Sequence, residues 1–350
     1  MSSLSEDLML KAVKKEPITR TPVWIMRQAG RYLPEYNKIK DSAGGFINLL
    51  KNPDLACEVT LQPLHRFNLD AAIIFSDILV VAELLNLKFE FIEKKGPVFL
   101  NTITNQKDIE KIPKKFDISK LNYVFEAIKL VKKELNNTKP LIGFIGSPWT
   151  VATYVVEGNS TKKFEKIKKM INEENSIIDE ILSLITHASI EYIENQIKSG
   201  VDIIMIFDTW SNLLKEKNYQ KYSLNYINKI NAVVREREIP IIYYSRNTYE
   251  NFNLAKNLDV DVLGINSGLD INVINKIIGK KFALQGNLDV NVLRQDDITI
   301  RNSIKKTLDN FGYGSGHIFN LGTGITPDIK PDKVELMIDY IRKISPNYHI

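Results

Sequence analysis

The stretch PVWIMRQAGRYLPEY, residues 22–36, begins with five apolar residues and then changes character. Two arginines, Arg27 and Arg31, flank the residues Gln28, Ala29 and Gly30. Small residues allow the backbone to approach a ligand closely. Guanidinium groups are planar, permanently charged forks that bind carboxylates. The stretch therefore predicts a buried strand that ends in a site for a polyanionic small molecule.

Seven further runs share the apolar character of residues 22–26 and are predicted strands. They are AAIIF (71–75), LIGFIG (141–146), DIIMIF (202–207), PIIYYS (240–245), DVLGIN (261–266), FALQG (282–286) and HIFNL (317–321). Most are apolar at consecutive positions rather than at alternate ones. This pattern is typical of parallel strands that are covered on both faces.

Segments with helical periodicity separate these runs, at 52–67, 121–136, 173–199, 218–238, 269–279, 297–310 and 331–344. Eight strands alternating with helices predict an α/β fold of the (β/α)8 TIM-barrel type. KFEFIE (88–93) and PVFLN (97–101) predict a β-hairpin inserted after the second strand. A doubly wound open sheet is the main alternative, and the count of eight strands ranks it second. No linker or composition break divides the chain, so residues 1–350 are expected to form one domain.

The composition excludes several classes of protein. The chain has 350 residues, 44% hydrophobic and 25% charged, as in soluble globular proteins. The net charge of +5 is spread along the chain, so we expect no nucleic-acid partner. The N-terminus does not resemble a signal peptide, and the apolar region 71–85 is too short to span a bilayer. We therefore expect a cytoplasmic protein with no membrane partner, in which the single cysteine, Cys57, is a structural thiol.

Polar side chains follow every predicted strand, at the end where TIM barrels carry their chemistry. In chain order they are Arg27, Gln28 and Arg31; Ser76 and Asp77; Ser147, Trp149 and Tyr154; Asp208, Thr209 and Trp210; Arg246; Ser267; Asn287; and Thr323 between Gly322 and Gly324. The predicted site thus combines arginines, a carboxylate directly behind an apolar strand, a phenol and several hydroxyls.

Motifs for common cofactors are missing from the sequence. The four histidines lie far apart, and none pairs with a cysteine at metal-ligand spacing. There is no Walker loop, no GxGxxG between a strand and a helix, and no serine elbow. We therefore expect a site that uses neither a metal nor an organic cofactor.

Four segments resemble signature segments of the uroporphyrinogen decarboxylase family. They are residues 22–36, IIFSDIL (73–79), GFIGSPWTVATYVVEG (143–158) and HIFNLGTGITPD (317–328), and the resemblance runs in register from about Leu8 to Tyr340. It implies a single (β/α)8 barrel that forms a homodimer and uses no cofactor. It also implies a carboxy-lyase of porphyrin and haem biosynthesis, which removes four acetate carboxylates from uroporphyrinogen III to give coproporphyrinogen III.

The resemblance also implies roles for individual residues. Asp77 matches the carboxylate that stabilises a cationic pyrrole intermediate, although Asp also suits the N-cap of the helix ILVVAELLN that follows. Arg27 matches a carboxylate clamp that takes part in proton delivery. The implied substrate-binding residues are Arg27, Gln28, Ala29, Gly30, Arg31, Asp77, Tyr154, Thr209 and Thr323.

Thr323 departs from the family pattern, which usually has His between the two glycines of NLGxG. A threonine hydroxyl can donate a hydrogen bond but cannot carry a charge. This departure motivates one alternative, a tetrapyrrole-binding barrel without catalysis. A second alternative, a corrinoid- or zinc-dependent methyltransferase, is disfavoured because zinc ligands are missing.

Overall fold

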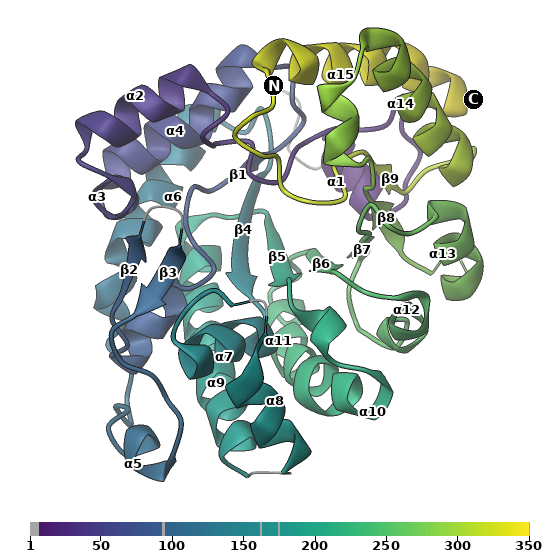
Figure 1. Ribbon diagram of the computed structural model, residues 1–350. Helices are drawn as coiled ribbons and strands as arrows, with labels where there is room; N and C mark the ends of the chain where they lie inside the picture. The colour runs from purple at the N-terminus through teal and green to yellow at the C-terminus, as the bar shows by residue number, and fades with distance from the viewer. Residues whose placement is uncertain (1–6, 93–94, 162, 174–175, 280, 350) are drawn as a thin grey trace.

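A curled parallel sheet lies at the centre of the molecule, surrounded by helices (Figure 1). The computed structural model describes residues 7–349 except 93–94, 162, 174–175 and 280. Within these residues the sheet has the order β1-β4-β5-β6-β7-β8-β9, and every pairing is parallel. The strands are β1 (Ala72–Ile73), β4 (Leu141–Gly146), β5 (Ile203–Asp208), β6 (Ile241–Ser245), β7 (Val262–Gly264), β8 (Ala283–Gln285) and β9 (His317–Ile318).

The first predicted strand, residues 22–26, closes the ring between β9 and β1. Val23 forms a parallel bridge with Phe319, whose N–H donates to the Pro22 carbonyl at 2.8 Å. On the other side, the N–H of Asp70 donates to the Val23 carbonyl at 2.9 Å. The barrel prediction is confirmed, but this segment is an isolated bridge rather than a full strand. Pro22 has no N–H, and the N–H of Val23 donates to the Asp70 carboxylate at 2.8 Å, so ladder bonds are replaced.

The helices form the outer layer in Figure 1. They are α1 (Leu8–Val13), α2 (Pro34–Ser42), α3 (Phe46–Leu50), α4 (Pro53–Arg66), α5 (Gln106–Ile109), α6 (Asn122–Leu135), α7 (Pro148–Glu157), α8 (Glu165–Asn172), α9 (Ile177–Ser199), α10 (Glu216–Tyr219), α11 (Asn225–Arg235), α12 (Tyr249–Ala255), α13 (Ile271–Ile278), α14 (Asp297–Phe311) and α15 (Pro331–Ile344). Short 3₁₀ helices lie at Val80–Leu85, Ile118–Leu121, Ser211–Leu213, Val290–Arg294 and Ser345–Tyr348, and a π-helix lies at Gln220–Leu224. Among the described helices, none is both long and apolar enough to cross a bilayer.

The predicted hairpin is confirmed as β2 (Phe89–Ile92) paired antiparallel with β3 (Gly96–Phe99). Its aromatic side chains pack toward α3, where the Phe46 and Phe91 ring centroids lie 4.5 Å apart. Cys57 is buried on α4, as expected for a structural thiol. All six residues of β4 are buried, which agrees with its unbroken apolar run.

Capping residues fix where helices begin next to the strand ends. The Ser147 hydroxyl accepts a hydrogen bond from the Thr150 N–H at 3.0 Å, and Pro148 occupies the first turn of α7. α7 therefore starts immediately after β4 and carries its first two turns across the same end of the barrel. Pro331 likewise occupies the first turn of α15.

At the opposite end of β1, the Asp70 carboxylate joins three segments. It accepts from both terminal nitrogens of Arg20, at 2.8 and 2.5 Å, and from Arg342 on α15 at 3.2 Å. Its side chain is only 7% exposed. Together with the Val23 N–H, these donors fasten the residue 20–23 segment to β1 and α15.

Replacing Asp70 with Asn should weaken the closure of the barrel. The substitution leaves the partly buried Arg20 guanidinium without its carboxylate, so we expect a loss of about 3 kcal/mol in the free energy of unfolding, measured by urea denaturation. Glu194→Gln is the matched control, because Glu194 pairs with Arg237 at 2.8 Å on the exposed surface. That change should cost less than about 1 kcal/mol. Equal losses in the two variants would contradict the assigned role.

Candidate active site

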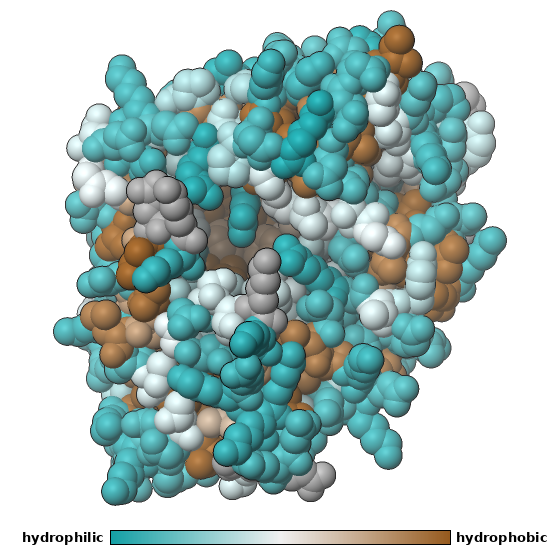
Figure 2. All heavy atoms as spheres, in the orientation of Figure 1, coloured by the Kyte–Doolittle hydropathy of each residue, from teal (hydrophilic) through white to brown (hydrophobic). Residues whose placement is uncertain are grey.

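The carboxyl ends of the parallel strands surround a hollow in the molecular surface. Figure 2 shows this face hollowed near its centre, where Figure 1 draws β1 and β4. Hydrophobic side chains lie deep in the hollow, and hydrophilic ones lie around its rim. A mouth of this kind is where TIM barrels place their functional groups.

Gln28 holds a tight turn that presents Arg27. Its side-chain oxygen accepts from the Ile25 N–H at 3.2 Å, and its amide nitrogen donates to the Ala71 carbonyl at 3.1 Å. Gln28 is fully buried, whereas Arg27 is exposed and has a φ of 66°, in the left-handed region. An arginine in this strained conformation needs external support, which the Gln28 amide supplies by tying the turn to the start of β1.

The loop after β9 packs against this turn. The Ile325 N–H donates to the Met26 carbonyl at 3.0 Å, which brings Thr323 and Gly324 beside Arg27. A Cβ atom added to Gly324 would approach the Arg27 Cδ to 2.6 Å, so only a glycine leaves the observed path of the arginine open. Thr323, the residue before Gly324, is partly buried.

Asp77 lies two residues beyond the apolar run that contains β1 and is partly buried. Its carboxylate accepts a hydrogen bond from the Leu79 N–H at 2.8 Å, but Leu79 rather than Asp77 is the N-cap residue of the 3₁₀ helix Val80–Leu85. Burial raises the pKa of Asp77 to about 6, against the opposing effects of the Leu79 N–H and the positive charge of Arg27. The ionised carboxylate is therefore under-solvated, and a cation placed beside it would be stabilised.

Tyr154 of α7 belongs to the same hollow. Burial raises the pKa of its hydroxyl, and the negative charge of Asp77 acts in the same direction. The charges of Arg27 and Arg246 oppose this rise, as does the Trp210 side chain. The Tyr154 and Trp210 ring centroids lie 6.4 Å apart. The charges of Asp77, Arg27 and Arg246 therefore all act on Tyr154, although the four residues are distant in sequence.

Beneath this surface, the fully buried Asp208 anchors the loops. Its carboxylate accepts four hydroxyl hydrogen bonds, from Ser147 at 2.5 Å, Ser223 at 2.6 Å, Tyr243 at 2.8 Å and Thr150 at 3.0 Å. Burial raises the pKa of Asp208, and these donors counteract the rise. The network fixes the start of α7 and the adjoining Thr209–Trp210 segment, so Asp208 positions the site without facing it.

The remaining predicted residues lie around the mouth to different degrees. Ala29, Gly30 and Thr209 are partly buried, and Arg31 is exposed. Arg31 is close enough to Tyr36 for its charge to oppose the burial that raises the pKa of that hydroxyl to about 12. His317 is buried, contacts the Gly286 carbonyl at 2.9 Å and stacks on Phe311, so it is structural.

The prediction missed two aromatic residues of the mouth, Phe207 and Tyr244, and it placed Arg246 after a strand end without assigning it a role. Phe207 packs between Phe144 and Tyr244, with ring centroids 5.5 and 6.0 Å away. The Tyr244 hydroxyl donates to the Gly322 carbonyl at 2.9 Å, which joins β6 to the loop after β9. Their sequence signal was weak because aromatic residues inside an apolar run are indistinguishable from core residues.

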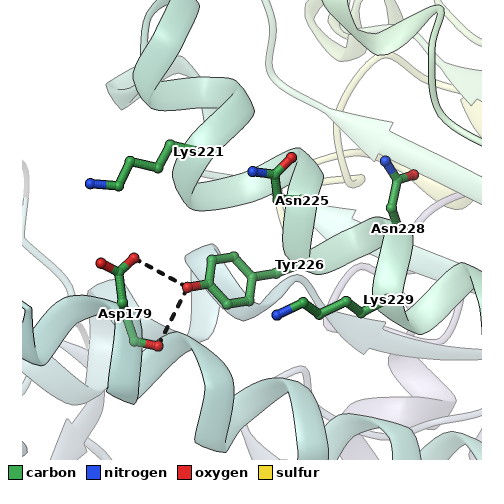
Figure 3. Close-up of a pocket in the computed structure, with 6 residues that line it drawn as sticks. All are labelled: Asp179, Lys221, Asn225, Tyr226, Asn228 and Lys229. Carbon is green, nitrogen blue, oxygen red and sulfur yellow. Dashed lines mark hydrogen bonds between the residues drawn. The ribbon is translucent and has the colours of Figure 1, made fainter.

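A separate cavity of about 390 Å³ lies in the helical outer layer rather than at the mouth. It is lined by Asp179, Lys221, Asn225, Tyr226, Asn228 and Lys229 (Figure 3). The Tyr226 hydroxyl donates to the side chain and the carbonyl of Asp179, at 3.2 and 3.4 Å. No group of three or more His, Cys, Asp or Glu residues that could hold a metal ion occurs in the described part of the chain.

Replacing Asp77 with Asn should stabilise the fold at neutral pH. The pKa of about 6 exceeds the value of about 3.9 for an unfolded aspartate, so ionisation costs the folded state stability as the pH rises through this window. Asn cannot ionise, yet its oxygen can still accept from Leu79. We expect a gain of about 2 kcal/mol at pH about 7.5 that shrinks toward zero near pH 4. Urea denaturation across this range measures it.

Asp309→Asn provides a control of opposite sign. Hydrogen bonds from Lys305 and Tyr348 lower the pKa of Asp309, so its ionised form stabilises the folded state above the unfolded pKa. This variant should lose stability at neutral pH, and the loss should vanish as the pH falls. If Asp77→Asn also lost stability at neutral pH, the result would show that the Asp77 carboxylate is favourably solvated in the folded state.

Comparison with known proteins gives one consistent family. The family model described as "Uroporphyrinogen decarboxylase (URO-D)" matches residues 4–344. The chain is 44% identical to the uroporphyrinogen decarboxylase of Legionella pneumophila (strain Lens), over all of both chains. It is 43% identical to that of Methylococcus capsulatus, over 97% of this chain and 98% of the relative.

Among solved structures, a methyltransferase from Methanosarcina mazei superimposes with a TM-score of 0.78 at 18% identity, over 98% of this chain and 99% of the other. This likeness supports the barrel fold. The sequence identities of 43–44% and the family match over residues 4–344 show that the chain is more closely related to the uroporphyrinogen decarboxylases than to this methyltransferase. The chain belongs to the uroporphyrinogen decarboxylase family, the carboxy-lyases of haem biosynthesis.

Proposed function

We propose that this chain, acting as one domain over residues 1–350, removes the carboxyl groups of the four acetate side chains of uroporphyrinogen III. The products are coproporphyrinogen III and four CO₂, formed without a cofactor. The observation that carries the proposal is the under-solvated carboxylate of Asp77 at the barrel mouth, with Arg27 near enough to oppose its raised pKa.

Loss of CO₂ needs a group that accepts the electron pair of the breaking carbon–carbon bond. Protonation of a pyrrole carbon makes the ring cationic, and the pair flows into it. A second protonation, at the exocyclic carbon, then completes the methyl group, and the ring carbon releases the first proton to restore the neutral pyrrole. Asp77 stabilises the cationic ring by accepting hydrogen bonds from the pyrrole N–H groups. Its raised pKa supports this role, because a poorly solvated anion gains more from a neighbouring cation than a solvated one does.

Arg27 and Arg31 bind peripheral carboxylates of the substrate and hold the macrocycle over Asp77. The guanidinium of Arg27 keeps its own proton, since a guanidinium group is a very weak acid. It therefore directs proton delivery by orienting a water molecule or a substrate carboxylate. The supported turn at Gln28 suits this task because it fixes the direction of the Arg27 side chain.

The other predicted contacts complete the site. Ala29 and Gly30 contribute backbone close to the ligand, and Gln28 acts through the turn because its side chain is fully used inside the fold. Tyr154 contributes its hydroxyl group from α7, and Thr209 and Thr323 contribute theirs from the segments after β5 and β9. As in the family resemblance, we propose that the enzyme works as a homodimer in the cytoplasm.

Anaerobic incubation with uroporphyrinogen III tests the function directly. We expect partly decarboxylated intermediates followed by coproporphyrinogen III, separated by chromatography after oxidation to porphyrins. Added chelator should leave the rate unchanged. Binding of the substrate without any decarboxylated product would favour the alternative that Thr323 motivates, a tetrapyrrole-binding barrel without catalysis.

Asp77→Asn should fold and bind substrate but lose turnover by a factor of about 10² to 10³, because the neutral amide cannot stabilise the cationic ring. Single-turnover rates at saturating substrate measure this loss. Asp179→Asn is the matched control, since Asp179 lies in the outer cavity, and its rate should not change. A near-normal rate for Asp77→Asn would remove the cation-stabilising role while leaving the family assignment intact.

A further inference from the structure

Arg246 lies across the barrel mouth from Arg27. In the ring formed by the Val23 segment, β1, β4, β5, β6, β7, β8 and β9, strand β6 is the fourth neighbour of the Val23 segment in either direction. Arg27 follows the Val23 segment, and Arg246 directly follows β6. The two guanidinium groups therefore start from opposite sides of the hollow.

An aromatic ring supports the Arg246 side chain. Its Cζ atom lies 5.8 Å from the centroid of Trp210, whose ring lies 4.7 Å from that of Phe164 and 6.4 Å from that of Tyr154. Stacking uses one face of a guanidinium and leaves its N–H groups at the edges available to an acceptor. Arg246 is nevertheless exposed, so it is held in place but not covered.

The arginines of this chain divide into two groups. Six form ion pairs with Asp or Glu: Arg20, Arg66, Arg235, Arg237, Arg294 and Arg342. In the described part of the chain, the other four show no carboxylate within 4 Å, and three of them, Arg27, Arg31 and Arg246, follow strand ends at the mouth. An exposed cation that is positioned by stacking but not neutralised is suited to bind an anionic ligand.

Arg27 and Arg246 both act on the same two tyrosine hydroxyls, those of Tyr154 and Tyr244. Burial raises the pKa of both the Tyr154 and Tyr244 hydroxyls, and the charges of Arg27 and Arg246 oppose the rise in each case. For Tyr244, a side-chain hydrogen bond with Arg246 opposes it as well. Tyr244 also donates to the Gly322 carbonyl, next to the uncharged Thr323. The field of Arg246 therefore reaches the part of the mouth where the loop after β9 supplies no charge of its own.

We infer that Arg246 is a third carboxylate-binding cation of this site, which grips the edge of the macrocycle opposite the edge held by Arg27. The inference rests on the proposed function. Uroporphyrinogen carries carboxylates around its whole periphery, so cations on opposite sides can hold it at two edges and fix its rotation over Asp77. Arg246 acts in binding and positioning rather than in the bond-breaking step.

Arg246→Gln, Arg246→Lys and the control Arg301→Gln test the inference. Arg301 also lies over an aromatic ring, Tyr340 at 5.0 Å, but on the outer helix α14. Loss of one charge-assisted contact should raise KM for uroporphyrinogen III roughly tenfold in Arg246→Gln, with a smaller change in kcat. Arg246→Lys should recover part of this loss, and Arg301→Gln should match the original chain.

A binding experiment separates this inference from the proposed function. Uroporphyrin III carries the same eight carboxylates and reports binding by its fluorescence, whether or not the chain turns over substrate. We expect Arg246→Gln to bind it roughly tenfold more weakly and with a smaller dependence on salt, at an unchanged melting temperature. If the original chain shows no turnover but Arg246→Gln still binds uroporphyrin III more weakly, the proposed function is wrong and the inference about Arg246 stands. Unchanged affinity and KM in Arg246→Gln would overturn the inference.

Discussion

Closure of the barrel at Val23 is the constraint on which the site depends. The segment is too irregular to pair as a full strand, so the Asp70 carboxylate holds it by its backbone N–H and by Arg20. This arrangement places the next turn, and with it Arg27, beside the end of β1 and the loop after β9. Residues from the two ends of the chain thereby meet in one hollow.

Several residues at the hollow are held in states that suit ligand binding rather than stability. Asp77 is poorly solvated, Arg27 takes a left-handed backbone conformation, and Arg246 lies exposed on an aromatic ring. The first two features cost the folded state some stability, and all three suit the binding of a polyanion that becomes cationic at its centre. The buried Asp208 and its four hydroxyl donors offset part of that cost by fixing the start of α7, which carries Tyr154, and the segment that carries Trp210.

Sequence reasoning predicted the parts of the molecule that have local signals. Apolar runs identified the strand positions, Ser147-Pro148 identified the start of α7, and the strand positions in turn placed Arg27 and Asp77 at strand ends. The reduction of residues 22–26 to a bridge was not predictable, since it depends on a carboxylate that is nearly 50 residues away in sequence. The burial of the Gln28 side chain was likewise not predictable, because a buried amide and an exposed one have the same sequence signal.

Arg246 shows why position alone was not enough to assign a site residue. A lone arginine after a strand is as well explained by a surface ion pair as by a ligand. Two facts that only the fold supplies separate these explanations: the aromatic ring beneath the side chain and the place of β6 opposite the Val23 segment. The substrate class carries charges around its whole rim. A barrel that binds these charges on one side only therefore allows the macrocycle to rotate in the site. A cation opposite Arg27 removes that freedom, and the ring order makes β6 the strand placed directly across from it.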